Sequence, residues 1–98
     1  MDYRVRVRSK AYLWGGTGIE EELHEIFPGY LTVRNDEFGE PVSIGTEEHH
    51  SDGRIEQKPL GQLGRGQTYT LHLARFTGVY AEQKDGLPTT ITCEIHGR

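Results

Sequence analysis

The densest group of chemically active side chains in this sequence is the run EEHHSD at residues 47–52. Imidazole nitrogens and carboxylate oxygens together bind zinc, nickel or copper when the backbone holds them in a fixed geometry. Neighbouring residues of an extended chain point to opposite sides, so His49 and His50 can share an ion only across a turn. The sequence also contains no HExxH pattern. We therefore expect no metal and no other cofactor, and retain His49 and His50 only as weak candidate ligands.

Nucleophilic catalysis would need a cysteine or a serine beside a histidine. Cys93 is the single cysteine, and it lies on the apolar side of an alternating segment, where a thiol is usually an inert packing residue. The serines, Ser9, Ser43 and Ser51, lie in no recognisable catalytic motif. A lone cysteine also excludes an internal disulfide and a cysteine-based zinc site. The sequence thus predicts a protein that is not an enzyme.

The stretch GGTG at residues 15–18 precedes a helical pattern, and glycine-rich loops at a helix start can bind phosphate. The stretch lacks the Lys-Ser/Thr ending of a phosphate-binding loop and the third spaced glycine of a dinucleotide-binding loop. The three glutamates at residues 20–22 would also repel an anion. A turn between a strand and a helix explains this stretch better.

Cationic side chains alternate with apolar ones over residues 2–14 (DYRVRVRSKAYLW). This period of two predicts one long strand with an apolar face toward the core and a cationic face toward water or a partner. The cationic residues are Arg4, Arg6, Arg8 and Lys10. Arg75 joins them as a candidate partner-binding residue, because a bulge at residues 77–78 would turn it outward.

The charges are distributed unevenly along the 98 residues, whose net charge is −4. Residues 1–16 carry a balance of +3, residues 17–57 a balance of −9 and residues 58–98 a balance of +2. Such asymmetry suits either internal neutralisation or the steering of a charged partner. The sequence shows no apolar run of membrane-spanning length and no signal peptide, so we expect a cytoplasmic protein without a membrane contact.

A helix is predicted over residues 18–27, because its apolar residues recur at helical spacing. These residues are Ile19, Leu23, Ile26 and Phe27. Thr17 and Glu20 form a capping box at its start, and the Pro-Gly pair at residues 28–29 ends it.

Alternation returns in four further segments, which we pair as two hairpins. The first joins residues 30–34 to 41–44, and the second joins a strand from Gln67 through Val79 to residues 90–96, with Val79 facing Ile91. Residues 45–66 contain five glycines and few strongly apolar residues, and are therefore predicted to be a mobile loop.

These elements predict a single α+β domain over residues 1–98, in the order β-α-β-β-long loop-β-β. About five mostly antiparallel strands would form one sheet, and the helix would pack on it. For the function we expect a small protein-binding module, such as an inhibitor, an immunity or antitoxin protein, or a phage-encoded blocking protein, present as a monomer or homodimer. A nucleic-acid-binding sheet that uses the Arg4, Arg6, Arg8 and Lys10 ladder is the alternative. A small enzyme or metal-binding protein is the third interpretation.

Overall fold

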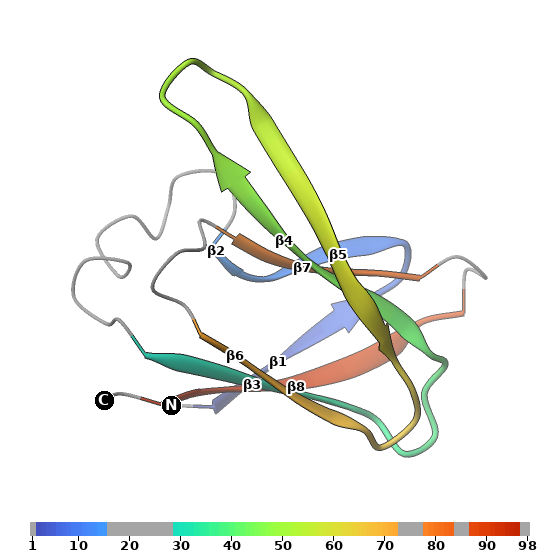
Figure 1. The fold of residues 1–98 in the computed structure, drawn as a ribbon. Helices are drawn as coiled ribbons and strands as arrows, with labels where there is room; N and C mark the ends of the chain where they lie inside the picture. Colours follow the sequence, from blue (N-terminus) through green and yellow to red (C-terminus); the bar gives the residue numbers. More distant parts are fainter. Residues whose placement is uncertain (1, 16–28, 73–77, 84–86, 97–98) are drawn as a thin grey trace.

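The computed structural model describes residues 2–15, 29–72, 78–83 and 87–96, and these form eight β-strands (Figure 1). The strands are β1 (Asp2–Val7), β2 (Lys10–Gly15), β3 (Tyr30–Asn35), β4 (Val42–His49), β5 (Ile55–Leu63), β6 (Thr68–His72), β7 (Gly78–Glu82) and β8 (Thr89–His96). No helix in this part of the chain is long and apolar enough to cross a membrane.

The strands form two four-stranded antiparallel sheets, with the orders β1-β8-β3-β6 and β2-β7-β4-β5. Figure 1 shows the two sheets lying one above the other. Among these eight strands, β4 and β5 are the only consecutive pair that share a sheet, so every other connection passes from one sheet to the other. This strand order is that of a jelly roll, a two-sheet architecture that hosts unrelated functions.

The predicted α+β fold is therefore wrong, because the described residues are all-β and contain no helix. The helix predicted over residues 18–27 lies outside the described residues. The apolar face that this helix was expected to cover is instead covered by a second sheet. The antiparallel character of the strand pairing was predicted correctly.

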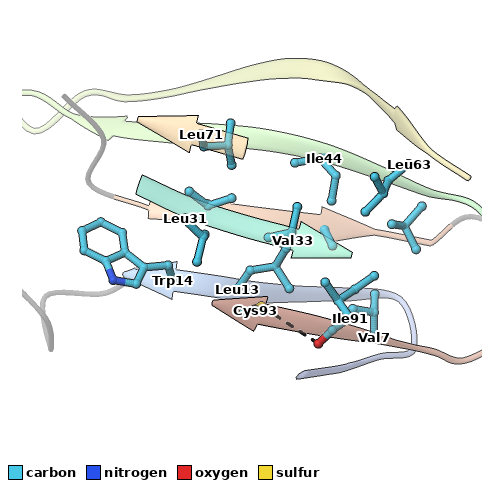
Figure 2. Packing of buried hydrophobic residues seen from close by; sticks show 13 residues of the cluster. Val7, Leu13, Trp14, Leu31, Val33, Ile44, Leu63, Leu71, Ile91 and Cys93 are labelled. Carbon is cyan, nitrogen blue, oxygen red and sulfur yellow. Dashed lines mark hydrogen bonds between the residues drawn. The ribbon is translucent and has the colours of Figure 1, made fainter. Parts of the chain in front are cut away.

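The core lies between the two sheets and is built from the side chains of each strand that face inward (Figure 2). Its buried members are Val7, Leu13, Trp14, Leu31, Val33, Val42, Ile44, Leu63, Leu71, Val79, Ala81, Ile91 and Cys93. These side chains come from every strand, so the two sheets share one continuous core. Because the inward side chains of one sheet pack against those of the other, a small number of apolar residues is enough to form this core.

The long first strand predicted over residues 2–14 is in fact two strands in different sheets. In β1 the alternation is as predicted, with Val7 buried and Arg4 and Arg6 exposed. The chain then bends at residues 8–9, and Lys10 begins β2 in the other sheet. An alternating pattern fixes which side chains face inward, but a short bend can move the chain to a facing sheet without disturbing that pattern.

Both predicted hairpins are wrong for the same reason. Strand β3 pairs with β6 and β8, whereas β4 pairs with β5 and β7. Strands β7 and β8 also lie in different sheets, so Val79 pairs with Thr46 and Trp14, and Ile91 pairs with Val5 and Asn35. The predicted bulge at residues 77–78 falls mostly on residues that are not described.

The loop predicted over residues 45–66 is also wrong, because β4 continues to His49 and β5 covers Ile55–Leu63. A tight turn joins these strands, with Gly53 at φ 89° and the Asp52 carboxylate accepting a hydrogen bond from the Arg54 N–H at 3.0 Å. Strand β5 is polar because it is an edge strand that is exposed on both faces for most of its length. Its proline and its glycine at φ 146° are also typical of an edge.

One end of the sandwich is held by the buried side chain of Asn35, which is 1% exposed. Its amide N–H groups donate to the carbonyl oxygens of Glu40 at 2.8 Å and Leu63 at 3.1 Å. Its amide oxygen accepts a hydrogen bond from the Thr89 hydroxyl at 2.7 Å. These bonds join β3 to the β3–β4 connection, the end of β5 and the start of β8. Gly39 packs so closely here that a Cβ would lie 1.8 Å from the Thr89 hydroxyl.

Replacing Asn35 by Ala should lower the free energy of unfolding by about 3 kcal/mol, because the Thr89 hydroxyl and the Glu40 and Leu63 carbonyls lose their buried partner. Urea denaturation followed by tryptophan fluorescence measures this loss. The control variant Gln62→Ala, on the exposed edge strand, should change the same quantity by less than about 0.5 kcal/mol. Equal, small losses in both variants would show that the Asn35 side chain does not hold this end together.

Candidate functional site

The outer face of the β1-β8-β3-β6 sheet places two arginines on either side of a threonine. Arg4 of β1 pairs with Thr92 of β8, and Thr92 pairs in turn with Arg34 of β3. Adjacent strands lie about 4.8 Å apart, so the backbones of the two arginines are about 10 Å apart. In the next row toward the Asn35 end, Arg6 pairs with Thr90. The result is a surface of guanidinium and hydroxyl groups.

A groove of about 450 Å³ crosses this surface beside the β3–β4 connection. Its lining residues are Arg4, Arg34, Asn35, Asp36, Glu37, Phe38, Thr90 and Thr92. This volume is enough for a few side chains of a partner or for a small polar ligand.

The rim of the groove is held in place by hydrogen bonds of Asp36. Its side chain accepts a bond from the Phe38 N–H at 3.1 Å, and its carbonyl accepts bonds from Gly39 at 3.1 Å and Gly66 at 3.2 Å. Its own N–H donates to the Thr90 carbonyl at 3.2 Å. Phe38 is nevertheless 89% exposed, so this turn presents an aromatic ring to solvent at the edge of the groove.

The guanidinium groups of Arg4 and Arg34 make no hydrogen bond or ion pair with any other residue that the structure describes. Other arginines do: Arg65 lies 3.3 Å from the Glu40 carboxylate, and Arg54 lies 3.4 Å from that of Asp52. The two groove arginines are exposed and so keep their donors available to a partner. Two residues of opposite charge, Asp36 and Glu37, lie on the groove rim beside these arginines.

The structure brings together only part of the predicted cationic ladder. Arg4 and Arg6 share the outer face of one sheet, with Arg6 lying 3.4 Å from the Thr90 hydroxyl. Arg8 lies in the bend after β1, and Lys10 belongs to the other sheet. Arg75 lies outside the described residues.

Arg34 is the groove residue that the sequence reasoning missed. Its alternation with Leu31 and Val33 placed it on an outward face, which the structure confirms. Its nearness to Arg4 depends on β8 lying between β1 and β3, and local sequence carries no signal for that pairing. Asp36 and Glu37 lie in the connection after β3, and the local sequence carries no signal that this connection borders a groove.

The outer face of the β2-β7-β4-β5 sheet carries a compact cluster around Glu47, which is 3% exposed. Its carboxylate accepts hydrogen bonds from the Tyr12 hydroxyl at 2.7 Å and the Gln57 amide at 2.9 Å. The bond to Glu47, together with burial, raises the pKa of Tyr12 to about 12. The Lys10 ammonium lies 4.7 Å from the centre of the Tyr80 ring. The polar groups of this cluster satisfy one another, so we assign it a structural role.

Of the two histidines considered as metal ligands, His49 ends β4 and His50 begins the turn that follows. The structure brings His50 close to Glu48 and Glu56 at the tip of the β4–β5 hairpin. Glu56 joins this group through the pairing of β4 with β5, which the sequence did not predict.

Comparisons with known proteins add a distant structural likeness. No protein-family model matches this sequence, and no curated protein matches it either. A solved structure described as "Bacillus endospore appendages form a novel family of disulfide-linked pili" is similar over 100% of this chain and 88% of that one. The sequence identity is 13% and the TM-score is 0.45. A likeness at this level does not bear on function.

Cys93 should resist thiol reagents while the protein is folded. The side chain is 0% exposed within the core, and burial raises the pKa of its thiol to about 12, so both access and thiolate formation are suppressed. Labelling with a chromogenic disulfide reagent at mildly alkaline pH should therefore proceed only after a denaturant is added. An introduced cysteine at the exposed position 51 (Ser51→Cys) should react at once. Rapid labelling of Cys93 without denaturant would contradict its placement in the core.

Proposed function

We propose that this chain is a small, non-enzymatic protein-binding module whose groove between Arg4 and Arg34 receives acidic side chains of a partner protein. The observation that carries the proposal is the pair of exposed arginines on either side of Thr92, whose guanidinium groups have no hydrogen-bond or ion-pair partner among the described residues. A guanidinium group is a planar fork of donors that matches a carboxylate in a bidentate geometry.

The other groove residues support a protein partner. Arginine and aromatic residues are enriched among the side chains that dominate protein–protein binding energies, and Phe38 supplies an exposed ring at the rim. The hydroxyls of Thr90 and Thr92 can donate to carbonyl or carboxylate oxygens between the arginines. A module of this kind could inhibit its partner simply by occupying the partner's surface.

The acids of the same surface argue against the nucleic-acid alternative. Asp36 and Glu37 line the groove, and the row beyond Arg4 contains Asp2 paired with Glu94. A phosphate backbone would be repelled by these carboxylates, whereas a protein surface can meet both signs of charge. The four-residue cationic ladder on which that alternative depended is divided between two sheets.

Reversing both groove charges, Arg4→Glu with Arg34→Glu, should abolish binding to the groove of a peptide that carries one pair of glutamates in an otherwise uncharged sequence. Titration with this peptide, followed by ¹⁵N-edited NMR, should shift the resonances of Arg4, Arg34 and Thr92 in the unaltered protein. The double variant should lose these shifts while its circular dichroism spectrum stays unchanged, because both side chains are exposed. Binding should also weaken as salt is raised.

The matched control reverses Arg54 and Lys58, which changes the net charge equally but lies at exposed positions outside the groove lining. This control should still bind the peptide through the groove. Equal loss of peptide binding in the control and the groove variant would show that binding depends on net charge alone, and would overturn the proposal. A single-stranded oligonucleotide that binds the same groove more tightly than the peptide would favour the nucleic-acid alternative.

A further inference from the structure

The tip of the β4–β5 hairpin gathers a histidine and two glutamates. This tip lies at the opposite end of β4 from the β3–β4 connection, which borders the groove (Figure 1). Glu48 and Glu56 lie directly opposite each other in the antiparallel pair. His50 follows Glu48 by two residues and therefore continues along the same face. One ligand atom from each of the three side chains lies within 4.8 Å of the others.

The distance between His50 and Glu56 is informative. The His50 Nε2 atom lies 3.7 Å from a Glu56 carboxylate oxygen, which is too long for a hydrogen bond. Two ligands that each lie about 2.0–2.2 Å from one tetrahedral zinc ion are about 3.4 Å apart. The observed spacing is thus close to that of two ligands of the same ion.

The His50 Nε2 atom is a second, separate observation that points to a ligand. The atom is shielded from solvent, although the side chain as a whole is 32% exposed, and it has no hydrogen-bond partner among the described residues. A shielded nitrogen without a partner is costly, and so are two carboxylates placed directly opposite each other on adjacent strands. A cation bound between the three groups would relieve both costs.

The backbone around the three side chains is well fixed. The His50 N–H donates to the Arg54 carbonyl at 2.8 Å, and the Gly53 N–H donates to the His50 carbonyl at 3.0 Å. The Asp52 carboxylate closes the turn by accepting from the Arg54 N–H. Ligands supplied from such a turn and from paired strands need little further ordering when an ion binds.

We propose that Glu48, His50 and Glu56 form a binding site for a divalent transition-metal ion of the zinc type, with water completing its coordination. A donor set of one imidazole and two carboxylates suits zinc better than calcium or magnesium, which take oxygen ligands. The site does not depend on the proposed groove, because the two share no residue.

Zinc chloride added to the purified, metal-free protein should bind with a stoichiometry of one in isothermal titration calorimetry. Glu56→Gln and His50→Gln should each weaken zinc binding by at least about tenfold, since each removes a direct ligand. The NMR resonance of the His50 Nε2 atom should shift on zinc addition, which a purely structural role would not produce. Circular dichroism of both variants should match that of the unaltered protein, because the hairpin tip lies outside the core.

The matched controls are Glu94→Gln and His96→Gln, which alter another histidine–glutamate pair, with 3.5 Å between its charged atoms. These controls should keep the zinc affinity within about twofold. No zinc binding by the unaltered protein would overturn the proposal and leave His50 and Glu56 as a simple ion pair. Binding that survives both hairpin variants, or that falls equally in the controls, would show that zinc binds elsewhere and would also overturn it.

Discussion

The fold depends on how the chain passes between its two sheets, and the buried Asn35 amide fixes these passages at one end. A single side chain there bonds to the β3–β4 connection, to the end of β5 and to the start of β8. Its backbone N–H donates to the Gln67 carbonyl in the β5–β6 connection. A polar group this deeply buried is tolerated because both of its N–H donors and its oxygen are satisfied. The groove lies directly against this point, since the β3–β4 connection forms its rim.

The sequence predicted which side chains of a strand face the core, but it did not predict which strands pair with each other. The alternation in β1, β3 and β8 correctly placed Val7, Val33 and Ile91 in the core and Arg4 outside it. Strand pairing was beyond reach, because in a jelly roll neighbours in a sheet are distant in the chain. Strand β5 was missed because an edge strand needs few apolar residues, so its composition resembles that of a loop. Of the candidate site, Arg4 was predicted, but its proximity to Arg34 depends on those distant pairings.

The two proposed sites use different consequences of the same architecture. The groove forms where three strands of one sheet lie side by side and a short connection rises beside them. The hairpin tip joins β4 to β5, which among the eight described strands are the only consecutive pair in one sheet, so its ligands come from residues close in the sequence. The two sites also differ in charge, because arginines lie in the groove and two opposed glutamates lie at the hairpin tip. The cluster around Glu47 lies on the outer face of the other sheet and stabilises β4.

Backbone NOE contacts in an isotope-labelled sample test the central claim, which is that the described strands that follow one another in the chain, apart from β4 and β5, lie in different sheets. The account predicts cross-strand contacts that link Thr92 to both Arg4 and Arg34, and contacts that link Ile91 to Val5. Backbone contacts between Val79 and Ile91 would instead mean that β7 and β8 form a hairpin within one sheet. That result would separate Arg4 from Arg34 and contradict both the fold and the groove.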